Sequence, residues 1–277
     1  MTHPFPSLVD IGANLTHDSF DTDFDQVIER AQAAGVKTIM LTGTDLSTSQ
    51  QAAQYSKQQP TVFRSTAGFH PHVANQWDSE ASAVIRELVG RDEVVAIGEC
   101  GLDFNRDFSP RETQLQVFEE HLKIAEFAQK PLFLHQREAH EPFFALLERY
   151  RNRIKGGVVH CFTDSKAALD DYLALDMYIG ITGWVCDERR GAELQEIVKY
   201  IPPDRLLIET DAPYLLPRTL RPKPKSRRNE PCHLVEVVRM LAQCTGREAE
   251  QIAEESTRNA HRLFGLPIES TGTWSSR

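Results

Sequence analysis

Residues 24–42 read FDQVIERAQAAGVKTIMLT and contain a helix pattern followed directly by a strand pattern. Over residues 24–34 apolar side chains recur at spacings of three and four, which is typical of a helix with one buried face. Gly35 is a residue type that commonly ends helices. Residues 36–42 form a short apolar run of the kind found in strands that are buried on both faces. This stretch therefore predicts a helix that leads into a buried strand.

The same alternation recurs along the chain. The predicted strands are Leu8–Ile11, Val36–Thr42, Val62–Gly68, Val94–Gly98, Leu132–His135, Val158–His160, Tyr178–Ile181 and Leu206–Glu209. The predicted helices are Phe24–Ala34, Ser79–Val89, Pro110–Ala128, Ala139–Tyr150, Ser165–Leu175, Gly191–Tyr200, Cys232–Thr245 and Ala249–Phe264. Ser109 followed by Pro110 predicts an N-cap with proline in the first helical position.

Strands that alternate with helices predict parallel pairing through βαβ crossovers. Eight such units in 277 residues favour a single (β/α)8 TIM barrel, with a doubly wound open sheet as the alternative. Since no shift in composition marks a second domain, the predicted barrel domain spans residues 1–268. Residues 269–277 are expected to form a flexible tail.

Composition narrows the class of protein. Hydrophobic residues make up 40% and charged residues 26%, which fits a globular chain. Five scattered cysteines without a CxxC pair argue against a disulfide framework and a zinc ribbon. With no basic leader and no apolar run long enough for a bilayer, we expect a cytoplasmic protein without a membrane partner. The net charge of −9 excludes a uniformly basic surface but allows a local basic patch.

Candidate chemical groups follow the ends of the predicted strands. They are Asp10, Asn14, His70, His72, Glu99, His135, His160 and Asp211. In barrels the C-terminal ends of the strands carry the active site, so these side chains should converge. Each one alone could be a hydrogen-bonded core residue or a helix cap. Burying several imidazoles and carboxylates together without a cation would be costly, so the set predicts a metal site.

Seven segments carry a resemblance to a known family. They are STAGFHPH (65–72), GECGLDFNR (98–106), LFLHQR (132–137), VVHCFT (158–163), YIGITGWVCDERRG (178–191), LLIETDAPYL (206–215) and SRRNEP (226–231). Together they resemble the TatD family of metal-dependent deoxyribonucleases, over residues 9 to about 266. The resemblance implies an amidohydrolase-like TIM barrel. It also implies a Mg²⁺-dependent 3′→5′ exonuclease that prefers single-stranded DNA and RNA, with a role in DNA repair or nucleic-acid degradation.

The resemblance also implies roles for individual residues. Glu99, His135 and His160 are the expected metal ligands, and this mixture of donors is compatible with Mg²⁺, Mn²⁺ or Zn²⁺. Asp211 is expected to be the general base, and a further ligand of the metal. His70 and His72 are expected to hold a phosphate oxygen or stabilise the leaving oxygen. The alternative for the two histidines is a pair that caps the turn around Pro71.

The opening motif departs from the pattern of many family members. Those members begin with D-x-H-x-H, whose histidines bind one metal of a pair, whereas this chain has Gly12 and Asn14 at those positions. We therefore expect either a single tightly held metal or a second metal that binds weakly. Asp10, Asn14 and Asp103 are the candidates for a second metal or for the residues around the first.

A basic, proline-punctuated segment spans residues 217–231. Its cations Arg227 and Arg228, together with Arg137, are the expected phosphate contacts, and the alternative is a solvated charge run. Trp184 and Phe104 are candidates for stacking on bases.

Two other functions stay open at this point. One is hydrolysis of a lactone, an amide or an aminoacyl ester by the same barrel, and the other is a non-enzymatic scaffold. The expected partner is single-stranded DNA or RNA, bound by a monomer without an obligate protein partner.

Overall fold

The computed structural model describes residue 5 and residues 7–267. The predicted tail, residues 269–277, lies outside these residues, and the predicted domain limits of 1–268 stay a prediction. The chain divides into two compact units. The first contains the described residues up to 40, residues 161–165 and residues from 179 onward, and the second contains residues 41–160 and 166–178.

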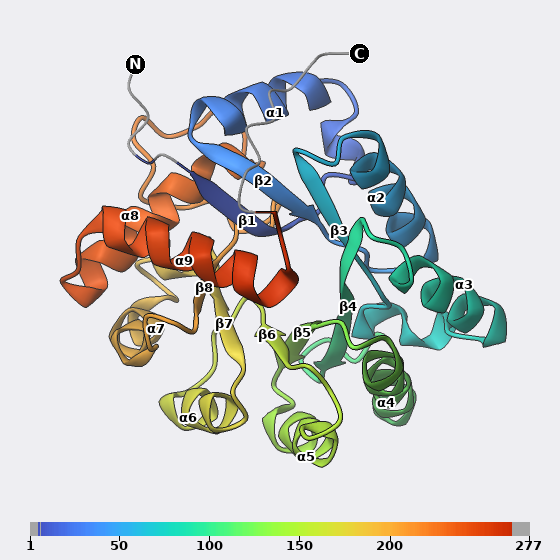
Figure 1. The fold of residues 1–277 in the computed structure, drawn as a ribbon. Coiled ribbons are helices and arrows are strands. Elements are labelled where there is room, and N and C mark those ends of the chain that lie inside the picture. Colours follow the sequence, from blue (N-terminus) through green and yellow to red (C-terminus); the bar gives the residue numbers. More distant parts are fainter. Residues whose placement is uncertain (1–4, 6, 268–277) are drawn as a thin grey trace. The chain divides into compact units, whose positions relative to one another are not determined.

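All eight predicted strands are present, in the order of the chain from β1 to β8 (Figure 1). They are β1 (Leu8–Ala13), β2 (Val36–Leu41), β3 (Phe63–Ala67), β4 (Val94–Asp103), β5 (Leu132–Arg137), β6 (Gly157–Val159), β7 (Tyr178–Ile181) and β8 (Leu206–Ile208). Strand β4 pairs in parallel with β3 and with β5, and the pairs β5–β6 and β7–β8 are parallel as well. This sequential parallel order is the one that a (β/α)8 barrel requires.

Helices follow most of the strands. They are α1 (Phe24–Ala33), α2 (Leu46–Gln58), α3 (Ser79–Val89), α4 (Arg111–Ala128), α5 (His140–Tyr150), α6 (Lys166–Ala174), α7 (Ala192–Ile197), α8 (Leu234–Thr245) and α9 (Ala249–Phe264). Short 3-10 helices lie at Asp18–Phe20, Pro71–Gln76, Gly183–Cys186, Val198–Tyr200 and Pro231–His233. None of the helices in the described part of the chain is both long and apolar enough to cross a membrane.

The core of the second unit joins its helices to its strands. Helix α4 packs on β4, and the rings of Phe118 on α4 and Phe143 on α5 stack with centroids 5.1 Å apart. Tyr172 on α6 is fully buried and meets Phe143 edge to face. In the first unit, α9 packs on β1 and β8. The Asn259 side chain of α9 donates to the carbonyl oxygens of Pro203 and Leu206, at 2.8 and 2.9 Å, and so ties this helix to the start of β8.

Helix α2 was absent from the predicted helices. Its buried face consists of Ser49, Ala52, Ala53 and Ser56, so the sequence LSTSQQAAQYSKQ shows no apolar periodicity. The helix begins with a capping box, in which the Asp45 carboxylate accepts from the Thr48 backbone and the Thr48 hydroxyl accepts from the Asp45 backbone. Small residues on the buried face allow close packing, and the capping box was the available sequence signal.

The predicted N-cap of α4 was wrong by one residue. Pro110 is the N-cap, and Ser109, the residue before it, is fully buried. The Ser109 hydroxyl donates to the His72 carbonyl oxygen at 3.1 Å and accepts from the Asn75 N–H at 3.1 Å. Ser109 therefore anchors the segment that contains His72.

Strand β4 continues five residues beyond its predicted end. Its pairing with β5 is irregular between Gly98 and Cys100, and both Gly98 and Gly101 have left-handed φ values, of 134° and 142°. A side chain at Gly101 would lie 1.9 Å from the His135 carbonyl oxygen. Glycine is therefore required where β4 approaches β5, and this approach brings Glu99 and Asp103 alongside His135.

His121 on α4 is a fully buried imidazole outside the predicted site. Its Nδ1 donates to the Val117 carbonyl oxygen at 2.7 Å, and its Nε2 accepts from the Phe69 N–H at 3.1 Å. Trp77 packs against the ring, with centroids 4.7 Å apart. One donor and one acceptor describe a neutral imidazole, and burial lowers the pKa of His121 from 6.5 to about 4.

We expect His121 to make the protein less stable in mild acid. The unfolded chain takes up a proton near pH 6.5 and the folded chain only near pH 4, so stability that is present above pH 6.5 is lost as the pH falls to 4. The shift corresponds to a loss on the order of 3 kcal/mol. His121→Gln, which can still accept from Phe69 but does not titrate, should lose less stability over this range. Urea unfolding of both proteins at pH 7 and pH 4.5 measures the difference, and equal losses would contradict it.

Candidate metal centre and active site

Three imidazoles in the second unit converge on one oxygen of Glu99. The Glu99 Oε1 atom lies 2.7 Å from His160 Nε2, 3.0 Å from His135 Nδ1 and 3.3 Å from His70 Nε2. The Glu99 side chain is 6% exposed. Burial alone would raise its pKa, but the His160 and His70 imidazoles hold the pKa of Glu99 well below its ordinary value. The centre of the cluster is therefore an anionic carboxylate ringed by nitrogen ligands.

This cluster has the composition of a metal site. The ligand atoms of His70, Glu99 and His135 all lie within 4.8 Å of one another, and His160 meets the same carboxylate oxygen. Carboxylate and imidazole donors suit Mn²⁺ and Zn²⁺ and accept Mg²⁺. The structure thus brings together Glu99, His135 and His160, three of the four predicted ligands, and places His70 beside them.

Asp103 holds two histidines of this region. Its Oδ2 atom lies 2.9 Å from His72 Nε2 and 3.1 Å from His135 Nε2. Burial opposes its ionisation, but His135 and His72 hold the pKa of Asp103 below its ordinary value. Buried Gln114 accepts from the Asp103 N–H and donates to its carbonyl oxygen, at 2.9 and 3.1 Å. Asp103 is therefore fixed, and it can orient His135 so that the other ring nitrogen faces Glu99.

His70 also makes the contact that the turn-capping alternative predicted. Its Nδ1 accepts from the His72 N–H at 3.0 Å, at the start of the 3-10 helix Pro71–Gln76. An imidazole whose Nδ1 accepts carries its proton on Nε2 when it is neutral, and that nitrogen faces Glu99. Burial lowers the pKa of His70 to about 4, which favours the neutral ring. His70 therefore both caps this turn and belongs to the cluster around Glu99.

The first unit holds three further predicted residues, Asp10, Asn14 and Asp211. Asp10 is fully buried, and burial raises its pKa to about 7. Its Oδ1 accepts from the Gly12 N–H and the Thr210 N–H, and its Oδ2 accepts from the Thr210 hydroxyl. Asn14 Nδ2 donates to Asp211 Oδ1 at 3.0 Å. Within this unit, Asp10 and Asn14 thus bind the segment that contains Asp211.

One exposed aromatic residue beside the cluster, Phe108, was not among the predicted site residues. The Phe108 side chain is 63% exposed, and its ring meets that of His72 edge to face at 4.8 Å. Each predicted stacking residue already has a cation over its ring, since Arg111 lies 4.5 Å from the centroid of Phe104 and Arg190 lies 4.4 Å from that of Trp184. The sequence showed Phe108 only as an apolar residue in a polar loop.

The basic segment contains cations of two kinds. Arg228 forms ion pairs with Asp23 and Glu230, at 2.7 and 2.9 Å, and lies over the Phe20 ring. Arg218 pairs with Glu188 at 2.8 Å. Within the described residues no ion pair is found for Lys223, Lys225, Arg227 or, on β5, Arg137, and all four are exposed. Only cations of this second kind are available to a phosphate.

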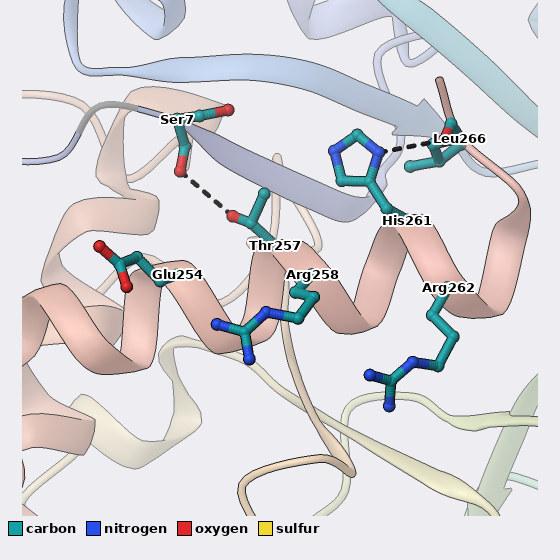
Figure 2. A pocket seen from close by; sticks show the side chains of 7 residues that line it. All are labelled: Ser7, Glu254, Thr257, Arg258, His261, Arg262 and Leu266. Atoms are coloured by element: carbon teal, nitrogen blue, oxygen red, sulfur yellow. Dashed lines mark hydrogen bonds between the residues drawn. The ribbon is translucent and has the colours of Figure 1, made fainter. Parts of the chain in front are cut away.

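A separate hollow of about 580 Å³ lies against α9 (Figure 2). Figure 2 shows Glu254, Arg258 and Arg262 along one side of this helix, and His261 bonded to the carbonyl oxygen of Leu266. Ser7 lies before β1, whereas Asn14 follows the end of β1 and Asp211 follows the end of β8. The hollow is therefore distinct from the predicted site.

Residues 9–265 match the TatD-related DNase family. This chain belongs to that family. The 3′-5′ ssDNA/RNA exonuclease TatD of Erwinia tasmaniensis is 50% identical over 259 residues, which are 94% of this chain and all of that protein. The family resemblance seen in the sequence is confirmed.

Solved structures show that this TatD-family chain is similar to known proteins in its fold as well as in its sequence. A TatD family hydrolase from Entamoeba histolytica has a TM-score of 0.86 and 26% identity, covering 96% of this chain and 100% of that one. YjjV, a TatD homologue from Escherichia coli K12, has a TM-score of 0.85 and 26% identity, covering 94% and 98%. With the sequential strand order, these likenesses confirm the predicted TIM barrel over the open-sheet alternative.

We expect the neighbours Arg227 and Arg228 to respond differently to substitution by alanine. Arg228→Ala leaves Asp23 and Glu230 without this partner and should lower the free energy of unfolding by roughly 1–2 kcal/mol. Arg227→Ala removes an exposed cation and should change that free energy by less than about 0.5 kcal/mol. Urea unfolding of both variants measures this. Equal stability of the two variants would show that the ion pairs of Arg228 do not contribute to the fold.

Proposed function

We propose that this chain is a metal-dependent 3′→5′ exonuclease that hydrolyses phosphodiester bonds of single-stranded DNA and RNA. The observation that carries this proposal is the convergence of His70, His135 and His160 on one buried oxygen of Glu99. It occurs in a member of the TatD-related DNase family, and the similar protein of Erwinia tasmaniensis is named as an exonuclease on these substrates.

Mg²⁺ is the metal we propose, held by Glu99, His135 and His160, with Asp211 as a further ligand. Such an ion supplies Lewis acidity that polarises a phosphoryl oxygen. The donors fit, because Glu99 is anionic and Asp103 can keep the proton of His135 on the nitrogen that faces away from Glu99. Mn²⁺ and Zn²⁺ are compatible with the same donors.

Asp211 is the proposed general base, accepting the proton of the attacking water. Its carboxylate follows β8, where TIM barrels place catalytic residues, and it is half-buried. His72, hydrogen-bonded to Asp103, is proposed to stabilise the leaving oxygen. His70 is proposed to hold a phosphate oxygen through Nε2. Asp10 and Asp103 are proposed to support the residues that they contact.

The proposed substrate contacts are exposed groups. Arg137, Lys223, Lys225 and Arg227 would neutralise backbone phosphates, and Arg228 would hold the segment that contains the last three. Phe108 offers an open ring face to a base beside His72. An exonuclease needs a free strand end at its catalytic groups, and this favours single strands. We propose that the enzyme acts in the cytoplasm as a monomer without an obligate protein partner. None of its five cysteines, which all lie in the described residues, forms a disulfide.

End-labelled single-stranded oligonucleotides test this function. With a label at the 5′ end and Mg²⁺ present, the protein should give a ladder that shortens from the 3′ end, and a chelator should stop it. Glu99→Ala should abolish the ladder and reduce the uptake of metal measured by calorimetry. A 3′-blocked oligonucleotide is the matched control and should resist digestion. Hydrolysis of lactones or amides with intact oligonucleotides would refute the proposal.

Asp211→Asn should lower kcat by a factor on the order of 10²–10⁴, because an amide cannot accept the proton of water. Asparagine keeps the shape of the side chain and one oxygen for the metal, so the thermal midpoint should stay near that of the parent. The measurement is single-turnover cleavage of a labelled oligonucleotide. Asp164→Asn, a change at another aspartate, serves as the control. Near-parental turnover of Asp211→Asn would remove this carboxylate from the mechanism.

A further inference from the structure

The end of β1 is bound to the segment that follows β8 by backbone hydrogen bonds. The Asp211 N–H donates to the Gly12 carbonyl oxygen at 2.8 Å, and the Asn14 N–H donates to the Ala212 carbonyl oxygen at 2.7 Å. Buried Asp10 adds its contacts with the backbone and the hydroxyl of Thr210. These hydrogen bonds hold the main chain at Asp211 and at its two neighbours, Thr210 and Ala212. The φ angle of Asp211 is 56°, in the left-handed region.

One side-chain hydrogen bond reaches the carboxylate of Asp211 itself. Asn14 Nδ2 lies 3.0 Å from Asp211 Oδ1. An ionised carboxylate only accepts hydrogen bonds, so the amide must turn its NH2 group, and not its oxygen, toward Asp211. The side chain of Asn14 thus acts as a donor to the proposed base.

We propose that Asn14 is a positioning residue, which holds the Asp211 carboxylate in one orientation, and that it is not a ligand of a second metal. This inference rests on the proposed function of Asp211. Backbone contacts fix where the Asp211 side chain starts, but they leave its χ angles free. A donor on Oδ1 restricts those angles, so the orientation of the second oxygen is set as well. At position 14 a hydrogen bond would then replace the histidine ligand of the D-x-H-x-H opening.

Asn14→Asp separates the two roles, because aspartate has nearly the same shape with different chemistry. A metal ligand at position 14 would work as well or better as a carboxylate, since hard cations prefer anionic oxygen. A donor to Asp211 would be lost, and two like charges would face each other. We therefore expect Asn14→Asp to lower kcat at least as much as Asn14→Ala, by about tenfold or more, with KM little changed.

Calorimetry supplies a readout that does not depend on turnover. Both variants should bind the same number of Mg²⁺ ions per chain as the parent. A lower stoichiometry in Asn14→Ala, or parental kcat in Asn14→Asp, would overturn the proposal. Asn152→Ala, at an exposed asparagine, is the matched control and should keep the parental kcat.

A double-mutant cycle with Asp211→Asn distinguishes positioning from general support of the fold. If Asn14 acts through Asp211, then adding Asn14→Ala to the Asp211→Asn variant should not lower kcat any further. Additive losses would overturn the proposal. If instead Asp211 is not the general base, then Asp211→Asn itself would keep near-parental turnover, so the two failures can be distinguished. A defective Asp211→Asn beside fully active Asn14 variants would refute the positioning role alone.

Discussion

A buried carboxylate is the constraint on which the second unit depends. Glu99 is taken out of water, and a charge in that position is tolerated only if neighbouring groups replace its hydration. Three imidazoles surround a single oxygen of this carboxylate. Their convergence requires β4 and β5 to approach so closely that no side chain fits at Gly101. The backbone of this unit thus brings together a group of side chains that could hold a metal ion.

The fold could be predicted from the sequence wherever the buried residues are apolar. Most strands contain an apolar run, and the limits of α3 and α9 coincide with the predicted ones, because their buried faces carry isoleucine, leucine and valine or phenylalanine at helical spacing. Helix α2 buries alanine and serine instead, so the periodicity that reveals a helix is absent. The length of β4 was also missed, because its end is polar and its glycines indicate a turn unless the partner strand is known.

The site was predictable to the extent that it follows from topology. A residue after a parallel strand lies at a known end of the sheet, and this position suggested eight candidates. The family resemblance then selected Glu99, His135 and His160 among them as metal ligands. Which atom meets which could not be predicted, because such contacts join residues far apart in the sequence. His72 and His135 share a contact with Asp103, whose backbone at the end of β4 is held by Gln114 on helix α4.

Arg227 and Arg228 show why charge in a sequence is an incomplete guide to nucleic-acid binding. The two are identical and adjacent, but Arg228 meets Asp23 and Glu230 over the ring of Phe20, and burial among these partners makes it part of the fold. A guanidinium that is already paired has few donors left, and a phosphate would have to displace two carboxylates to reach it. In a chain with a net charge of −9, the affinity for a strand must therefore come from the minority of cations without carboxylate partners. The acidic residues determine which cations those are, so they select the surface on which a phosphate backbone can bind.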